Sequence, residues 1–415
     1  PSPEIREDFG HSVSLSSNGN TLAVGALNEN SGATGINGDD TDTSKNGAGA
    51  VYVFTRSGTT WSQEAYIKSS TSNTVSIENG SSQDNFGAGV DLSNDGNTLL
   101  VTALAEDSNA TGINGDETNN SANNSGALYV FTRSGTTWSQ EAYIKSSNTE
   151  ANDGYITASL SGDGDTIALG ARGEDSNATG INGDQTDNSA NNSGAVYVFT
   201  RSGTTWSQEA YIKSSNPDVD DVFGDSIDLS NDGNTMVVGA PNEDSSATGI
   251  NGDQTDNSDR NFGAVYVFTR SGTTWSQEAY IKANIIGEIN DVFGESLQLS
   301  GDGNTLVVGT QQEDSNAIGI NGDQTNNSKE TSGAAYAFTR SGTTWSQIAY
   351  IKASNTDAGD RFGATYATGR HSPISLSNNG DILVIGAYSE ESNAIGIGGD
   401  QTNNTGNYSG AVYIY

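Results

Sequence analysis

Short runs of alternating apolar and polar residues recur along the chain about every 70 residues. In the fourth copy, an alternating run begins at Phe223 and ends at a turn that contains Asp232, where an Asp-Gly pair supplies the positive φ of a tight hairpin. Residues 235–240 form a continuous apolar run, as in a strand that is buried on both faces. After a long polar loop, residues 263–270 and 274–282 form two more alternating runs joined by a Ser-Gly turn. Each copy therefore predicts four short antiparallel strands.

Six copies of this pattern cover nearly the whole chain, at about residues 8–70, 84–147, 152–215, 221–284, 291–354 and 360–415. The fourth strand of the first five copies contains a near-identical T-T-W-S-Q segment, which holds all five tryptophans. No segment shows the sustained 3.6-residue period of a helix. We therefore predict an all-β fold, a single β-propeller domain over residues 1–415 with six four-stranded blades. The last blade lacks its outer strand, and the alternative is that the chain forms part of a seven-bladed propeller.

The sixth copy reaches only its third strand, residues 410–415. Residues 1–8 match the connector that precedes the first strand in other copies, so they offer little of a fourth strand. An unpaired strand edge invites pairing with another chain. Two interpretations stay open, namely a truncated or shorter blade and the exchange of a strand with another molecule. The opening residues show no signal peptide, and we expect a mature or trimmed extracellular piece.

The composition excludes several classes of function. The 415 residues carry 17 basic and 52 acidic side chains, for a net charge of −35. A nucleic-acid-binding surface needs a basic footprint, and an anionic membrane surface repels such a chain, so we expect neither as a partner. Without cysteine, the chain has no disulfides, thiolate metal sites or cysteine nucleophiles. No run approaches the roughly 20 apolar residues that span a bilayer, so we expect no membrane insertion.

The order of the motifs resembles the FG-GAP repeat of integrin α-subunit propellers and their bacterial relatives. The fourth copy shows the repeat in full, with Phe223-Gly224, an Asp-Gly turn and then Gly239-Ala240-Pro241. The other copies carry variants of the second motif, such as V-G-A-L-N-E and I-G-A-Y-S-E. The resemblance covers nearly all of the chain. It implies an extracellular or cell-surface propeller of bacterial type that binds a partner, with calcium as its cofactor.

The hairpin between the first and second strands is the place where integrin-like repeats hold calcium. Here the second copy keeps carboxylates at Asp91 and Asp95 but has Ser93 between them and apolar Leu99 at the closing position. Calcium takes six to eight oxygen ligands, so the loss of the closing carboxylate weakens such a site. We interpret this hairpin as an Asp-Gly turn.

The long loop between the second and third strands is the better candidate for calcium. Every copy carries a version of E-D-S-N-A-T-G-I-N-G-D-Q-T-D-N-S, which combines carboxylates, an Asn and glycines. The candidate ligands at its Asn-Gly-Asp core, which reads Gly-Gly-Asp in the sixth copy, are Asp39, Asp116, Asp184, Asp253, Asp323 and Asp400. The candidate partner carboxylates at its start are Asp107, Asp175, Asp244 and Asp314. Ordinary turns use the same residue types, so internal hydrogen bonding is the alternative explanation of this loop.

The sequence shows no catalytic set, and we predict that the chain is not an enzyme. The histidines, His11 and His371, lack the spaced partners of a zinc site. The tryptophans alternate with Ala and Ile, which favours packing between blades over a sugar-stacking platform. The most irregular positions, Arg370 and His371 with the loop at residues 72–83, are the places where the repeat could support an asymmetric function.

We therefore expect an extracellular binding or adhesion propeller that recognises a protein or glycan partner and is stabilised by calcium. The alternative function is a structural, self-assembling surface or filament subunit that associates with itself through the sixth blade's edge. A propeller hydrolase is the third candidate, but such enzymes generally place catalysis in a separate domain.

Overall fold

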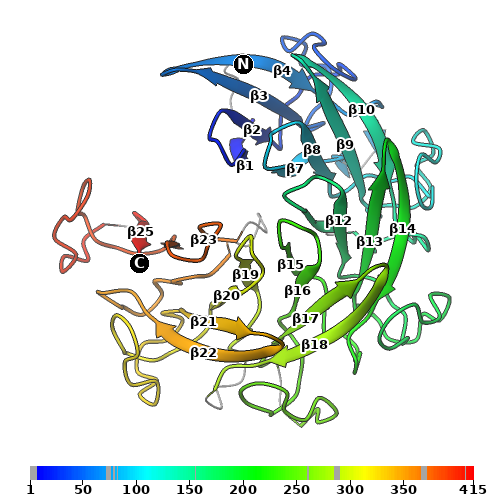
Figure 1. Cartoon of the computed structure of the whole chain (residues 1–415). Coiled ribbons are helices and arrows are strands. Elements are labelled where there is room, and N and C mark those ends of the chain that lie inside the picture. Colours follow the sequence, from blue (N-terminus) through cyan, green and yellow to red (C-terminus); the bar gives the residue numbers. More distant parts are fainter. Residues whose placement is uncertain are drawn as a thin grey trace. The chain divides into compact units, whose positions relative to one another are not determined.

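The computed structural model describes residues 7–71, 76–77, 80–81, 83–154, 156–258, 261–284, 290–365, 372–406 and 408–415. Within these residues the regular elements are all β-strands (Figure 1), and none of the described segments is a helix of the length and hydropathy that crossing a membrane requires. The chain divides into two compact units, Pro1–Ala178 with Asn182–Ile212 and Thr179–Ile181 with Lys213–Tyr415. We number the sheets as blades 1 to 6 in chain order and describe each unit by itself.

The first unit contains blades 1 to 3, each a four-stranded antiparallel sheet whose strands pair in chain order. Blade 1 consists of β1 (Phe9–Leu15), β2 (Thr21–Ala26), β3 (Ala50–Ser57) and β4 (Thr60–Ile67). Blade 2 consists of β7 (Phe86–Leu92), β8 (Thr98–Ala103), β9 (Ala127–Ser134) and β10 (Thr137–Ile144). Blade 3 consists of β11 (Ile156–Leu160), β12 (Thr166–Ala171), β13 (Ala195–Ser202) and β14 (Thr205–Ile212). A two-residue pair, β5 (Ser76–Ile77) and β6 (Gly80–Ser81), lies between blades 1 and 2 in sequence.

The second unit contains blades 4 to 6. Blade 4 consists of β15 (Ser226–Leu229), β16 (Thr235–Ala240), β17 (Ala264–Ser271) and β18 (Thr274–Ile281). Blade 5 consists of β19 (Ser296–Leu299), β20 (Thr305–Thr310), β21 (Ala334–Ser341) and β22 (Thr344–Ile351). Blade 6 has three strands among the described residues, β23 (Ile374–Leu376), β24 (Leu383–Ala387) and β25 (Ala411–Ile414). The predicted fold, an all-β propeller of six blades with a three-stranded last blade, is confirmed.

The Phe-Gly and Gly-Ala motifs meet at the seam between consecutive blades. Phe293 packs edge-on against Tyr336 and Phe338 of its own blade, with ring centroids 5.6 and 6.2 Å apart. Gly294 follows with φ of 94°, a conformation that favours glycine. Its carbonyl accepts a hydrogen bond of 2.7 Å from Ser226 Oγ of blade 4. In blades 4 and 5 this turn precedes the first strand, which begins at Ser226 and Ser296 and not at the predicted Phe-Gly pair.

The glycine of the second strand lies across the same seam. A Cβ on Gly239 would lie 2.2 Å from both Gly294 O and Ser226 Oγ. In blade 2, Thr102 takes the place of this glycine, and the next copy has Gly154-Tyr155 where the others have Phe-Gly. The glycine is thus required where a Phe-Gly pair of the following blade approaches closely.

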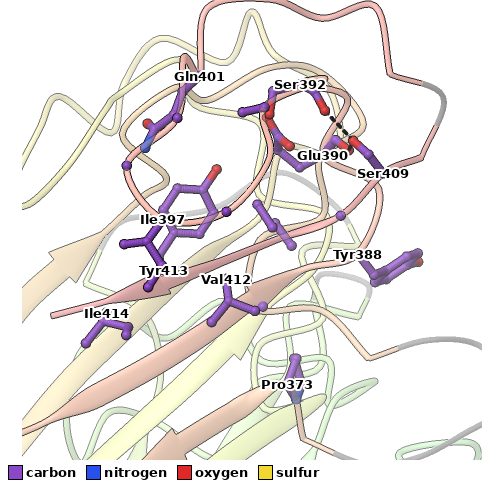
Figure 2. Close-up of a pocket in the computed structure, with 18 residues that line it drawn as sticks. Pro373, Tyr388, Glu390, Ser392, Ile397, Gln401, Ser409, Val412, Tyr413 and Ile414 are labelled. Carbon is purple, nitrogen blue, oxygen red and sulfur yellow. Dashed lines mark hydrogen bonds between the residues drawn. The ribbon is translucent and has the colours of Figure 1, made fainter.

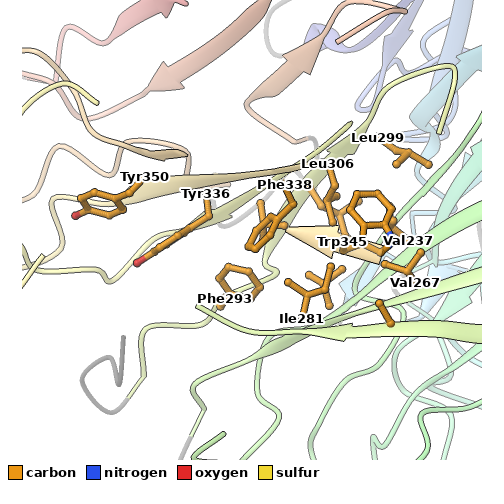
Figure 3. Close-up of a cluster of buried hydrophobic side chains, with 14 of the residues drawn as sticks. Val237, Val267, Ile281, Phe293, Leu299, Leu306, Tyr336, Phe338, Trp345 and Tyr350 are labelled. Atoms are coloured by element: carbon orange, nitrogen blue, oxygen red, sulfur yellow. The ribbon is translucent and has the colours of Figure 1, made fainter. Parts of the chain in front are cut away.

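Three tryptophans confirm the predicted packing between blades of the same unit. Trp138 Nε1 donates to Glu64 Oε1 of the preceding blade at 2.9 Å, and Arg133 Nη1 donates to the same oxygen at 3.1 Å while its guanidinium lies over the indole ring. The same triad forms between Glu141, Arg201 and Trp206 and between Glu278, Arg340 and Trp345. Figure 3 shows Trp345 in the apolar core that blades 4 and 5 share, together with Val237, Val267 and Leu306.

Trp61, in blade 1, differs from these three, because its side chain is 41% exposed whereas Trp138 is 4% exposed. No glutamate among the described residues forms the triad with Trp61, although Arg56 still lies over its ring at 5.5 Å. We expect acrylamide to quench one tryptophan of the five in the folded protein. The Trp61→Phe variant should lose this accessible fraction, whereas Trp138→Phe should retain it. Equal quenching of both variants would contradict the exposure of Trp61.

Candidate functional site

The six carboxylates of the Asn-Gly-Asp cores cap turns within their own loops. Asp116 Oδ1 accepts hydrogen bonds from the amide and the hydroxyl of Thr118, at 2.9 and 2.7 Å. These two bonds lower the pKa of Asp116, whose side chain lies at the surface. The same pair of bonds, each to the threonine two residues on, forms at Asp39, Asp184, Asp253, Asp323 and Asp400.

The carboxylates at the start of these loops fix the far end of the same loop. Asp107 Oδ1 accepts the amide of Asn124 at 2.7 Å, and Asn124 has φ of 52°. The equivalent bonds run from Asn192 to Asp175, from Asn261 to Asp244 and from Thr331 to Asp314. The internal bonding that the sequence left as an alternative is therefore present in these loops. Within the described residues no three His, Cys, Asp or Glu side chains gather around a common metal position. Calcium binding by the ten aspartates stays a prediction.

The hairpin between the first two strands is an Asp-Gly turn, as interpreted from the sequence. Asp95 Oδ1 accepts the amide of Asn97 at 2.9 Å and Ser93 Oγ at 2.7 Å, and Gly96 has φ of 69°. Asp91, which the calcium pattern would need as a ligand, instead joins three blades. It accepts Ser14 Oγ of blade 1 and the amide of Leu160 of blade 3. Burial raises the pKa of Asp91 to about 6.

A buried ion pair inside the blades is the feature that the sequence reasoning missed. Lys282, which follows β18, donates to Glu243 Oε2 at 2.6 Å, and both side chains are buried. Tyr280, also on β18, donates to the second oxygen of Glu243 at 2.8 Å. The same lysine and glutamate pair in three other blades: Lys68 with Glu29, Lys145 with Glu106, and Lys352 with Glu313. The sequence does contain a signal for this ion pair, because the loop glutamate occurs in all six copies and the lysine after the fourth strand occurs in five.

Blade 6 has the glutamate of this pair but no lysine. Glu390 is 1% exposed, and its Oε1 accepts a bond of 2.8 Å from the side chain of Asn355. Its Oε2 is buried and has no hydrogen-bond partner. A buried carboxylate oxygen without a partner is costly, because it loses its hydration without compensation. Glu390 is thus a buried carboxylate with one oxygen left without a hydrogen bond.

A pocket of about 770 Å³ lies against this glutamate and the edge of β25. Figure 2 shows Val412, Tyr413 and Ile414 of β25 around this pocket, with Glu390 and Ser409 at one end. Ser409 Oγ donates to the carbonyl oxygens of Glu390 and Ser392, at 3.0 and 2.6 Å. The pocket combines an open strand edge, an apolar wall and one buried carboxylate.

A second set of carboxylates that the sequence reasoning did not single out lies in the connectors before the first strands. Asp221 Oδ2 accepts the amide of Asp218 at 2.9 Å. Burial, reinforced by the charges of Glu243, Asp218 and Asp244, raises the pKa of Asp221 to about 8. Asp153 has the same connector position and a pKa raised to about 8, and Asp360 one raised to about 6, again by burial.

We expect Asp221 to make stability depend on pH. The pKa of Asp221 in the folded protein lies above its unfolded value of about 3.9. Its contribution to the free energy of unfolding is therefore fully present below about pH 3.9 and is lost as the pH rises through about 8. The urea midpoint of the wild-type protein should therefore fall between pH 6 and pH 9. The midpoint of the Asp221→Asn variant, which keeps an acceptor for the amide of Asp218, should fall less over this range. The midpoint of the Asp253→Asn variant, changed at an exposed position, should fall as much as that of the wild type. Parallel curves for all three proteins would contradict this assignment.

The irregular positions Arg370 and His371 and most of the loop at residues 72–83 lie outside the described residues. His11 is described, and burial lowers its pKa. The interpretation of these places as sites of asymmetric function stays a prediction.

One protein family matches part of the chain. The family described as FG-GAP repeat matches residues 206–268. No curated protein matches the chain. A hydrazine synthase structure from Kuenenia stuttgartiensis is 11% identical, with 94% of this chain and 77% of that chain covered and a TM-score of 0.49. The periplasmic gluconolactonase of Pseudomonas aeruginosa is 15% identical, with 91% and 80% covered and a TM-score of 0.45. At this level of similarity neither structure transfers an activity to this chain.

Proposed function

This chain is an FG-GAP repeat β-propeller, and we propose that it is a non-enzymatic binding protein that acts outside a bacterial cell or on its surface. Its partner is a protein or a glycan, and it contacts the loops between the second and third strands of the blades. One observation carries the proposal: these loops present the same capped carboxylate six times, at Asp39, Asp116, Asp184, Asp253, Asp323 and Asp400.

The loops suit recognition because they are ordered before a partner arrives. The bonds of Asp116 and Asp107 fix the middle and the end of one loop, and a backbone bond from the Asn114 amide to Tyr143 O holds the loop on the outer strand. A preordered surface loses little conformational entropy on binding. Its exposed oxygens can accept hydrogen bonds from sugar hydroxyls or from basic side chains, and the net charge of −35 speeds the approach of a basic partner.

The test is binding of the protein to a glycan array and to an array of peptides. We expect retention on one of the two, and at least a tenfold loss when all six core aspartates are replaced by asparagine. Asparagine keeps an acceptor for the threonine of each turn, so the melting temperature should change little. Retention on neither array, or equal retention of the wild type and the six-site variant, would refute the proposal.

We further propose calcium as a stabiliser of these loops, because their carboxylates and backbone carbonyls are the oxygen ligands that calcium prefers. Calcium at millimolar concentration should raise the melting temperature above that measured with a chelator, and the six-site asparagine variant should lose this difference. The same melting temperature in calcium and in chelator would remove calcium from the proposal and leave partner binding untouched.

Self-assembly is the second candidate, and the exposed edge of β25 is the observation that favours it. Val412 and Ile414 are 68% and 73% exposed, although the matching residues of blade 4, Val265 and Val267, are fully buried. An exposed apolar edge of this kind pairs readily with another strand. A mass above that of the monomer in analytical ultracentrifugation would support this candidate.

A further inference from the structure

We propose that blade 6 is a receptor for one extended polypeptide strand of the pattern Ala-Tyr-Ile-Lys, supplied by a segment outside residues 1–415. The strand pairs with β25, and its lysine enters the pocket and binds Glu390. This site includes part of the blade 6 loop but uses Glu390 and the edge of β25 rather than the core aspartates to which the proposed function assigns the partner, so the two can be tested independently.

The backbone of β25 fixes the register of such a strand. In blade 4, Val265, Tyr266 and Val267 pair with Ile281, Tyr280 and Ala279 of the outer strand. Val412, Tyr413 and Ile414 occupy the same positions of β25, because Val412 pairs with Gly386 of β24 as Val265 pairs with Gly239 of β16. An incoming strand in this register places isoleucine opposite Val412, tyrosine opposite Tyr413 and alanine opposite Ile414. It would cover the two exposed apolar side chains of β25.

The lysine is selected by Glu390. In blades 1, 2, 4 and 5 the lysine that follows the outer-strand isoleucine donates to Oε2 of the loop glutamate, at 2.6 to 2.8 Å. Oε2 of Glu390 is the one oxygen of this buried carboxylate that has no partner. A lysine at the same strand position brings an ammonium group to it and pairs the buried charge.

The rest of the lysine's surroundings is already formed. In blade 5, Lys352 also donates to Ser332 Oγ at 2.7 Å, and this hydroxyl donates to the carbonyls of Glu313 and Ser315. In blade 6, Ser409 Oγ makes the corresponding bonds to Glu390 and Ser392 and lines the pocket. The hydroxyl is thus oriented to accept from the incoming lysine.

The loop of blade 6 differs from the others in one contact with the outer strand. In blade 4, Asn251 Oδ1 accepts the amide of Tyr280, while its own amide donates to the carbonyl of Tyr280. Gly398 occupies this position in blade 6 and lines the pocket, so only the backbone bond is available to the incoming strand. We therefore expect the added strand to be held mainly by β25 and by Glu390.

A second copy of residues 1–415 does not offer this strand. The segments with the required pattern are β4, β10, β14, β18 and β22, and each is paired over its length with the third strand of its own blade. Donating one of them would break that ladder and leave another buried glutamate without its lysine. The occupant is accordingly a strand that no blade of this chain already uses.

The test is the binding of a fluorescently labelled peptide, T-T-W-S-Q-E-A-Y-I-K, to the whole chain, followed by anisotropy. We expect saturable 1:1 binding and slower hydrogen exchange at residues 412–414. Replacing the peptide's lysine by norleucine should weaken binding about 10- to 100-fold, the worth of a hydrogen bond to a charged group. The Glu390→Gln variant should bind the lysine peptide more weakly by a similar factor and should bind the norleucine peptide as the wild type does.

The controls separate this site from the core aspartates of the loops. The variant with all six core aspartates replaced by asparagine should bind the peptide as the wild type does, whatever it does on the arrays. The norleucine peptide tests the lysine on the unaltered chain, so the inference remains falsifiable even where Glu390→Gln fails to fold. Absence of binding at millimolar peptide, equal binding of the two peptides, or a dimer of residues 1–415 that the peptide does not dissociate would each overturn the inference.

Discussion

Replacing Lys282 by methionine should lower the free energy of unfolding by about 3–5 kcal/mol, the usual cost of removing one partner of a buried ion pair. Lys282 Nζ lies 2.6 Å from Glu243 Oε2, and both side chains are buried. Methionine fills a similar volume but leaves the carboxylate without its counter-charge in a place that water does not reach. The measurement is the urea midpoint and slope of the variant against the wild type.

Two controls show whether the loss comes from the unpaired charge. The double variant Lys282→Met with Glu243→Gln removes both charges and keeps an acceptor for Tyr280, so it should regain most of the lost stability. Glu390→Gln should be neutral or stabilising, because Glu390 has no lysine to lose. If the double variant were as unstable as the single one, packing and not charge would explain the loss.

Replacing Gly239 by alanine should lower the free energy of unfolding by about 1–3 kcal/mol or more, as overpacking in a core does. The new methyl group would lie 2.2 Å from the backbone oxygen of Gly294 and from Ser226 Oγ, which belong to two consecutive blades. A backbone carbonyl cannot rotate away as the end of a long side chain can, so blades 4 and 5 would have to separate at this seam. Thermal or urea unfolding measures the effect.

Gly386, the equivalent glycine of blade 6, is the matched control. A Cβ there would meet its nearest neighbour, Pro373 Cβ, at 3.5 Å, which is an ordinary contact. Gly386→Ala should therefore change stability by no more than about 0.5 kcal/mol. An equal loss in both variants would show that the backbone conformation of the glycine, and not the approach of the next blade, requires it.

The repeated pattern predicts the strands because each strand and turn depends on residues that are close together in the sequence. Residues 235–240 are apolar without interruption and form β16, between β15 and β17. The alternation of residues 274–282 gives β18, and Asp-Gly and Ser-Gly pairs give the turns, since these residues adopt the required backbone conformations at little cost. Counting the copies was enough to predict that blade 6 would contain three strands.

The candidate site was harder to predict from the sequence. The aspartates of the long loops stand at regular intervals, but spacing does not say whether an oxygen faces a cation or its own backbone. The structure places Asp116 on Thr118 and Asp107 on Asn124, because short polar side chains readily bond to amides nearby in the chain. The pairing of Lys282 with Glu243 joins residues 39 positions apart, and no local pattern connects them.

The sequence by itself determined the strand order, the number of blades and the copy that lacks an outer strand, because these follow from local periodicity and turn chemistry. Only the tertiary structure decided which side chains lie along the edge of that copy. It places Glu390, Ser409 and the exposed edge of β25 around one pocket, and it shows that the unpaired carboxylate oxygen is the one that binds lysine elsewhere. The physical reason is that burial and charge pairing arise from segments far apart in the chain, which only the folded blade brings together.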